Sequence, residues 1–155
     1  VQANHGIRPW LNILGKPIGK LLGEGRLMDS ESGSIIAIIA TDAPVSSLSL
    51  RQIAKRAAIG IGRGGSPGGN NSGDIFLSFS TQKLSTLEKK SEIFQERLEL
   101  NPDFIDPLYM AAVECVEEAV VNALVAGESV PTFKPPGLTC KSIDLEFLKG
   151  VFVDD

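Results

Sequence analysis

The strongest constraint on the fold is an apolar run at residues 35–40, inside the sequence GSIIAIIATDAP of residues 33–44. The run consists of four isoleucines and two alanines. β-Branched side chains favour strands, and an apolar run without polar alternation is typical of a strand that is covered on both faces. We therefore predict a buried strand over residues 34–40.

A glycine and a serine, Gly33 and Ser34, stand at the start of this predicted strand. Residues 19–32 before them are polar and contain glycines, so we expect an exposed loop that can be cut. Self-cleavage requires a hydroxyl to attack the carbonyl of the preceding residue, and a glycine there tolerates strained backbone. Ser34 is therefore a candidate nucleophile, and a purely structural serine at a strand edge is the alternative.

Self-cleavage between Gly33 and Ser34 would also supply a base. The chain has one histidine, His5, beside Gly6. A Ser-His-Asp triad would have to use it, but we interpret His5 as an exposed turn residue. A free α-amine on Ser34 has an unperturbed pKa of about 8, and it could accept the proton of its own hydroxyl.

A helix and a second strand are predicted to follow. The sequence SLRQ of residues 49–52 fits a capping box, which starts the helix at Ser49. Apolar residues then recur at helical spacing as far as Ile61. A glycine-rich loop is expected over residues 60–73, and the alternating sequence DIFLSFS predicts a strand over residues 74–80.

Three glycines in this region, Gly60, Gly62 and Gly65, have the spacing of a dinucleotide-binding motif. That motif lies between a strand and the helix that follows it, so that the phosphates meet the helix N-terminus. Here the glycines follow a helix and precede a strand. We therefore predict no nucleotide site, and the chain has no P-loop sequence.

The end of the glycine-rich loop carries a hydroxyl and a carboxylate, Ser72 and Asp74, next to Asn70 and Asn71. Because Ser72 and Asp74 lie two residues apart at the start of a strand, their side chains could hydrogen-bond to the same group. Alternatively, the polar side chains of the loop satisfy its own backbone. The residues alone leave both interpretations open.

The second half of the chain is predicted to be largely helical. Residues 81–105 form a polar connection with some helix around 87–98, and Asp106 caps a long helix that has Pro107 in its first turn and closes at Gly127. The proline-rich residues 131–137 are expected to be irregular. The sequence after residue 142 predicts a short helix up to residue 152.

The composition excludes several classes of function. The 155 residues suit one domain, and a net charge of −4 gives no electrostatic reason to bind nucleic acid or an acidic membrane. One histidine and two distant cysteines offer no metal-ligand spacing, so we expect neither a metal nor a cofactor. We interpret Trp10 and the seven phenylalanines as core residues. We interpret the basic residues at 51–63 as a solvated helix face. We expect a cytoplasmic protein.

The chain begins abruptly, with the sequence VQANHGIRPW and neither an initiator Met nor a signal peptide pattern. We interpret it as one part of a longer product, with a trimmed chain as the alternative.

Three segments together resemble the DmpA-type aminopeptidases, which comprise the L-aminopeptidase/D-amidase-esterases and the β-peptidyl aminopeptidases. They are VQANHGIRPWL, GSIIAIIATDAP and AAIGIGRGGSPGGNNSGDIFLSFST. The resemblance runs from Val1 to about Thr81 and continues more weakly through residues 108–126, whereas the tail after Ala126 departs from it. It implies an α+β fold, a four-layer αββα sandwich shared with the ornithine acetyltransferases, of which this chain is the C-terminal part.

The resemblance also implies a precursor that cuts itself at the Gly33–Ser34 bond. Residues 1–33 would be the end of an α segment including the cleavage leader, and residues 34–155 a β segment, both in one domain. By motif, Ser34 is the nucleophile and Asn4 resembles the oxyanion-hole side chain. Ser72 and Asp74 resemble the pair that orients the nucleophile and its amine, and some members have Glu in place of Asp74.

We therefore expect a self-processing serine aminopeptidase or amidase that releases N-terminal amino acids from short peptides, amides or esters through an acyl-enzyme on Ser34. Its expected partners are the remainder of the α segment and further copies of the αβ unit. A periplasmic location would follow if the missing N-terminal part carried a signal. The alternatives are an inactive homologue that serves as a binding module, and an acetyltransferase on the same fold, against which the serine at position 34 speaks. The preference for L-, D- or β-amino acids stays open.

Overall fold

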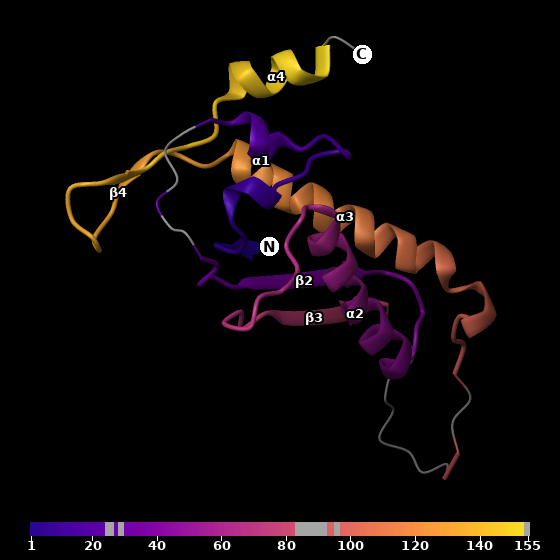
Figure 1. The fold of residues 1–155 in the computed structure, drawn as a ribbon. Coiled ribbons are helices and arrows are strands. Elements are labelled where there is room, and N and C mark those ends of the chain that lie inside the picture. Colours follow the sequence, from indigo (N-terminus) through magenta and orange to yellow (C-terminus); the bar gives the residue numbers. More distant parts are fainter. Residues whose placement is uncertain (24–26, 28–29, 83–92, 95–96, 154–155) are drawn as a thin grey trace.

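A computed structural model describes residues 1–23, 27, 30–82, 93–94 and 97–153 (Figure 1). The architecture is α+β, as predicted. In chain order, the elements are β1 (Gln2–Ala3), the 3-10 helix η1 (Arg8–Trp10), α1 (Ile18–Leu21), β2 (Ile35–Thr41), α2 (Ser47–Arg63), β3 (Ile75–Ser80), the 3-10 helix η2 (Pro102–Phe104), α3 (Asp106–Val125), β4 (Val130–Pro131), β5 (Thr139–Cys140) and α4 (Leu145–Val153).

The central sheet has the strand order β1-β2-β3. β1 runs antiparallel to β2, with Ala3 opposite Ile35, and β3 runs parallel to β2, with Ile75 opposite Ile36. α2 forms the crossover that parallel strands require. Both predicted strands, 34–40 and 74–80, are confirmed to within one residue at each end.

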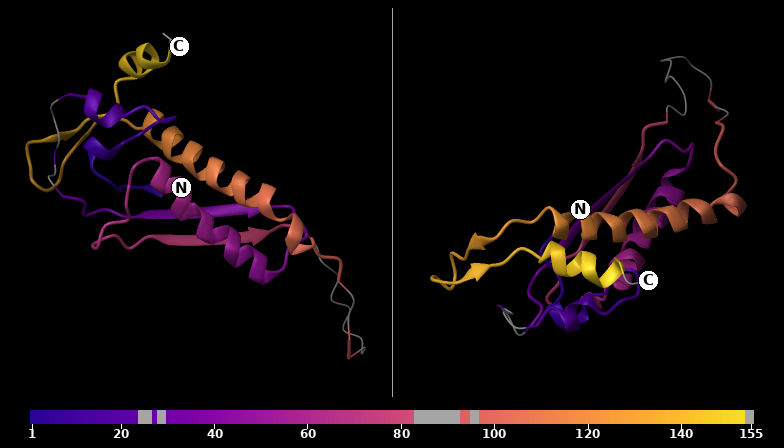
Figure 2. Two further views of the ribbon diagram at one scale, coloured as in Figure 1. Left: turned by 45° about the vertical axis from the view of Figure 1, so that its right-hand side comes forward. Right: turned by 90° about the horizontal axis from the view of Figure 1, so that it is seen from above.

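The two long helices α2 and α3 lie side by side over one face of this sheet (Figures 1 and 2). The core between them and β2 is aliphatic, and it consists of Ile35, Ala37, Ala57, Ile61, Val116 and Val120. Gly60 lets α3 approach α2 closely, because a Cβ at this position would be 2.6 Å from the carbonyl oxygen of Val113. At Gly65 the φ angle is +100°, and a Cβ would be 1.6 Å from the carbonyl oxygen of Trp10. The first and last glycines of the apparent nucleotide motif therefore serve packing.

The other face of the sheet is apolar and exposed. Its side chains have between 39% and 58% of their surface accessible; they are Ile36, Ile38, Ile75, Leu77 and Phe79. The prediction that the strand at 34–40 is covered on both faces is therefore wrong for the part of the chain that the structure describes. An apolar surface of this extent is typical of an interaction face.

The ends of the helices differ from the prediction. α2 begins at Ser47 because the hydroxyl of Ser46 accepts a hydrogen bond from the Ser49 N–H, so the cap is Ser46 rather than Ser49. α2 also continues to Arg63, which shortens the predicted glycine-rich loop. Asp106 is the first helical residue of α3, after an N-cap at Ile105 that makes no side-chain bond, although a proline does lie in the first turn.

Two predictions about the solvated surface also need correction. Trp10 is 39% exposed, and several phenylalanines are more exposed than that, because the described core is built from aliphatic side chains. The basic residues of α2 are not simply solvated. Arg56 stacks on the ring of Tyr109 at 3.9 Å, and Arg63 pairs with Glu117 at 3.1 Å.

The structure near the two chain ends can also be compared with expectation. Residues 11–14 form no strand, and an isolated bridge joins Ile13 to Lys16. Of the residues expected to be irregular at 131–137, only Pro131 lies in a strand, and the others form the loop of a hairpin between β4 and β5. α4 confirms the last helix, and its Leu148 packs on Ile13 and Ile18.

The helix expected around 87–98 falls largely on residues 83–92 and 95–96, which lie outside the described residues. None of the described helices has the length and apolar character needed to cross a membrane.

Candidate active site

Sheet topology brings the candidate residues to one place. β1 ends at Ala3, directly opposite the start of β2, and β3 starts beside the same point. Asn4 follows β1, Ser34 precedes β2 and Asp74 precedes β3. Residues that are 30 and 70 positions apart therefore meet at one edge of the sheet.

Asn4 and Ser34 are joined by two hydrogen bonds. The Asn4 backbone N–H donates to the Ser34 carbonyl oxygen at 3.1 Å, and the Ser34 N–H donates to Oδ1 of the Asn4 side chain at 2.8 Å. Since the oxygen of the side-chain amide accepts from Ser34, its Nδ2 end is the donor that it can offer to a further group.

Gly33 is pressed against Asn4. A Cβ at Gly33 would be 1.6 Å from the backbone carbonyl oxygen of Asn4 and 3.0 Å from its Oδ1. Only glycine permits this close approach of two backbones. The φ angle of Gly33 is not in the left-handed region, so the structure gives close contact, rather than backbone strain, as the reason for this glycine.

The hydroxyl of Ser34 is held by the glycine-rich loop. Its Oγ accepts a hydrogen bond from the Gly73 N–H at 2.9 Å. A hydroxyl that accepts from a backbone amide can still give its own proton to a base. The amide dipole also favours negative charge on Oγ, which lowers the cost of forming a nucleophile.

Ser72 and Asp74 are bonded to each other and to the start of β2. The Ser72 hydroxyl donates to Oδ1 of Asp74 in a short hydrogen bond, and the same oxygen accepts the Ile35 N–H at 3.0 Å. The Ser72 N–H remains within the loop and donates to the Gly69 carbonyl oxygen at 2.8 Å. The carboxylate thus fixes the loop to the residue after Ser34, and the loop also satisfies part of its own backbone.

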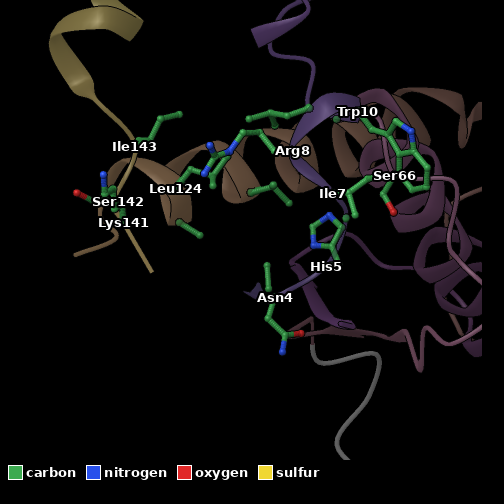
Figure 3. Close-up of a pocket in the computed structure, with 16 residues that line it drawn as sticks. Asn4, His5, Ile7, Arg8, Trp10, Ser66, Leu124, Lys141, Ser142 and Ile143 are labelled. Carbon is green, nitrogen blue, oxygen red and sulfur yellow. The ribbon is translucent and has the colours of Figure 1, made fainter. Parts of the chain in front are cut away.

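His5 lies beside this cluster and is half-buried, so its interpretation as an exposed turn residue is wrong. Burial lowers the pKa of the imidazole below its usual 6.5, although the nearby negative charges of Asp74 and Glu31 act in the opposite direction. Its Nδ1 is buried without a hydrogen-bond partner in the described structure. The neutral ring faces a cavity of about 320 Å³ that Asn4, Arg8 and Trp10 also line (Figure 3).

Sequence reasoning missed Glu31, whose carboxylate accepts three hydrogen bonds at the edge of this cluster. No sequence signal distinguishes it, since an acidic residue in a polar segment is ordinary. Within the described ranges, no three His, Cys, Asp or Glu side chains are grouped so that they could hold a metal ion.

Comparison with known proteins places this chain in a family. Residues 1–135 match the model of peptidase family S58. The chain is 37% identical over 145 residues to beta-peptidyl aminopeptidase BapA of Sphingosinicella microcystinivorans, an alignment that covers 84% of this chain and 36% of that protein.

Solved structures agree with the sequence match. The L-aminopeptidase D-Ala-esterase/amidase from Ochrobactrum anthropi superposes with a TM-score of 0.84 and 44% identity, covering 97% of this chain and 41% of that one. It is described as a prototype for the serine aminopeptidases and a new variant of the Ntn hydrolase fold. A Burkholderia sp. beta-aminopeptidase superposes with a TM-score of 0.78 and 34% identity, covering 99% of this chain and 42% of that one.

The chain thus spans about two fifths of the length of these relatives. Within that span, the family model covers most of the residues, including all four candidate site residues. As the DmpA-type resemblance predicted, this chain belongs to peptidase family S58.

Proposed function

We propose that this chain is part of a self-processing serine aminopeptidase or amidase in which Ser34 is the nucleophile. The observation that carries the proposal is the environment of Ser34. Its Oγ accepts from Gly73, its N–H donates to Asn4, and the next residue is fixed by Asp74. A structural serine at a strand edge needs no such set of partners.

The first reaction would be cleavage of the chain itself. Ser34 Oγ attacks the carbonyl carbon of Gly33, and the C–N bond between the two residues breaks. The hydroxyl proton passes to the Ser34 nitrogen, which becomes a free α-amine. Water then hydrolyses the ester that joins Gly33 to Oγ. The products are a C-terminal carboxylate on Gly33 and a restored Ser34 hydroxyl.

The second reaction would use the new amine as the base. It takes the proton of the Ser34 hydroxyl as Oγ attacks the carbonyl carbon of an N-terminal amino-acid amide, ester or short peptide. Nδ2 of Asn4 donates to the oxyanion that develops. The proton passes to the leaving amine or alcohol, and water hydrolyses the acyl-enzyme.

Asp74 and Ser72 hold the nucleophile in place in this scheme. Asp74 binds the Ile35 N–H and the Ser72 hydroxyl through one oxygen, so the loop that carries Gly73 stays next to Ser34. After cleavage, Asn4 Oδ1 lies within hydrogen-bond reach of the new amine, because it already accepts from that nitrogen.

The remainder of the α segment is the first partner that we propose. The described chain provides a three-stranded sheet with α2 and α3 over one face, and a four-layer sandwich places a second large sheet on the other. The exposed apolar side chains of β2 and β3 are what such a sheet would cover. Assembly of the αβ units into a homo-oligomer remains part of the proposal by family resemblance.

Mass spectrometry of the full-length protein tests the proposal. We expect two fragments that meet between Gly33 and Ser34, and turnover of p-nitroanilides of L-, D- or β-amino acids. A Ser34→Ala variant should stay uncut and inactive, whereas Ser129→Ala, an exposed hydroxyl bonded to Ser142, should behave as wild type. A processed and active Ser34→Ala protein would refute the assignment, and an intact, inactive wild type would favour an inactive homologue.

A further inference from the structure

The segment before the Gly33–Ser34 bond carries an anchored carboxylate. Glu31 lies three residues before Ser34, and both of its carboxylate oxygens accept hydrogen bonds. Oε1 accepts the Gly6 N–H at 2.8 Å and the Ser66 hydroxyl at 3.0 Å, and Oε2 accepts the Gly69 N–H at 3.0 Å. Glu31 is half-buried, so these contacts are partly shielded from water.

The three donors come from the two segments that carry the candidate site. Gly6 lies two residues after Asn4, whereas Ser66 and Gly69 belong to the loop that ends at Ser72–Asp74. Glu31 therefore ties the leader to both sides of the cluster around Ser34.

The surroundings of the carboxylate fit it closely. Ser66 is only 8% exposed, and its Oγ also accepts the Gly68 N–H at 3.3 Å. A Cβ at Gly69 would be 2.4 Å from Oε2 of Glu31, so a side chain there would displace the carboxylate. Hydrogen bonds to an ionised acceptor are roughly twice as strong as neutral ones, which makes the carboxylate a firm attachment point.

We propose that Glu31 is a positioning residue for self-cleavage, an inference that rests on the proposed function. It anchors the leader on the glycine-rich loop and so fixes the Gly33 carbonyl relative to the Ser34 hydroxyl, which the same loop holds through Gly73. The role ends with the cut, because the mature nucleophile no longer acts on the leader. Glu31 thus matters more for processing than for turnover of substrate.

The test compares Glu31→Gln with wild type in the full-length precursor. Glutamine keeps the shape, but its NH₂ group would face the Gly69 N–H or displace the other two donors. We expect the appearance of the two fragments to slow by about tenfold or more, and kcat of the fully processed variant to change by less than about threefold. Glu146→Gln, at an exposed pair with Lys149, should change neither rate.

A second variant tests the same contact from the other side. Gly69→Ala should also slow processing, and the double variant Glu31→Gln/Gly69→Ala should be little slower than the slower single variant, since both changes disrupt one contact. The thermal midpoint is measured for each protein.

The outcomes separate the two proposals. A wild type that is cut together with a Glu31→Gln variant cut at the same rate overturns the role of Glu31 alone. Equal losses of processing rate and kcat with a lowered thermal midpoint also overturn it, because a merely structural residue would produce that pattern. A wild type that is never cut overturns the proposed function and this inference with it.

Discussion

Two regions of the central sheet have opposite character. At the edge where β1 ends and β2 and β3 begin, Asn4, Ser34 and Asp74 satisfy one another or nearby backbone through hydrogen bonds. On the face away from α2 and α3, the side chains are apolar and exposed. The contacts that hold the candidate nucleophile therefore lie within the described residues, whereas the cover of the sheet does not. Changes at the edge should alter chemistry, and changes on the face should alter stability.

The largest expected effect at the edge, beyond loss of Ser34 itself, is that of Asn4→Ala. Removing one oxyanion donor costs about 3 kcal/mol in the transition state, so kcat should fall by roughly a hundredfold or more. Steady-state kinetics on a p-nitroanilide substrate measures it. Asn4→Asp, which keeps the shape and loses the donor, should be at least as slow. Asn12→Ala, which removes an exposed amide that donates to the Trp10 carbonyl oxygen, is the control. A fully active Asn4→Asp enzyme would contradict the oxyanion role.

The apolar face gives the next prediction. If the rest of the α segment covers it, Ile38→Ser should lower the free energy of unfolding of the full-length protein by about 2 kcal/mol or more. Leu14→Ser, at a turn residue that is 78% exposed, should change it by less than about 0.5 kcal/mol. Urea unfolding measures both. Equal and small effects would show that the face stays open to water.

Gly33→Ala sharpens the comparison at the edge. The new Cβ cannot share space with the Asn4 carbonyl oxygen, so the backbone must move and loosen the Asn4–Ser34 contact. We expect self-cleavage to slow by about tenfold or more, measured as the rate at which the two fragments appear. Gly62→Ala is the matched control, because a Cβ there meets nothing within 4 Å. Wild-type processing in Gly33→Ala would refute the steric argument.

The smallest effect concerns His5 and pH. Its pKa is lowered by burial, so the folded protein takes up a proton less readily than the unfolded chain. The contribution of His5 to the free energy of unfolding is fully present above about pH 6.5. It is lost as the pH falls through the lower pKa of the folded state. Urea midpoints between pH 7.5 and 5 should fall less steeply in His5→Gln than in wild type. An unchanged slope would show that the burial of His5 has no such consequence.

The sequence predicted the strands better than the surfaces around them. The isoleucine run predicted β2 and the alternating sequence DIFLSFS predicted β3. Both predictions succeeded because the preference of β-branched and alternating side chains for strands is a local property of the sequence. They could not reveal that one face of β2 is exposed, since an apolar run looks the same whether its cover comes from the same segment or from elsewhere. The cap of α2 was misplaced because Ser46 and Ser49 offer the same hydroxyl.

The residues of the candidate site were predicted on other grounds than the strands. The loop sequence singled out Ser72 and Asp74, and family resemblance supplied Asn4 and a role for all three. The antiparallel and parallel pairings of β2 explain why they meet. Glu31 escaped prediction because its donors, Gly6, Ser66 and Gly69, are distant in sequence and two of them act through backbone amides. The identity of the Glu31 side chain alone does not predict these hydrogen-bond donors.

The pairing of β1 with β2 has a consequence for the fate of the protein after the cut. β1 lies before the Gly33–Ser34 bond and β2 after it, so cleavage would nick the connection between two strands that remain hydrogen-bonded. The fragments would behave as the halves of a split protein and stay together without a covalent link. Their separation would require the removal of an edge strand from its neighbour, so denaturant, rather than dilution alone, should be needed to part them.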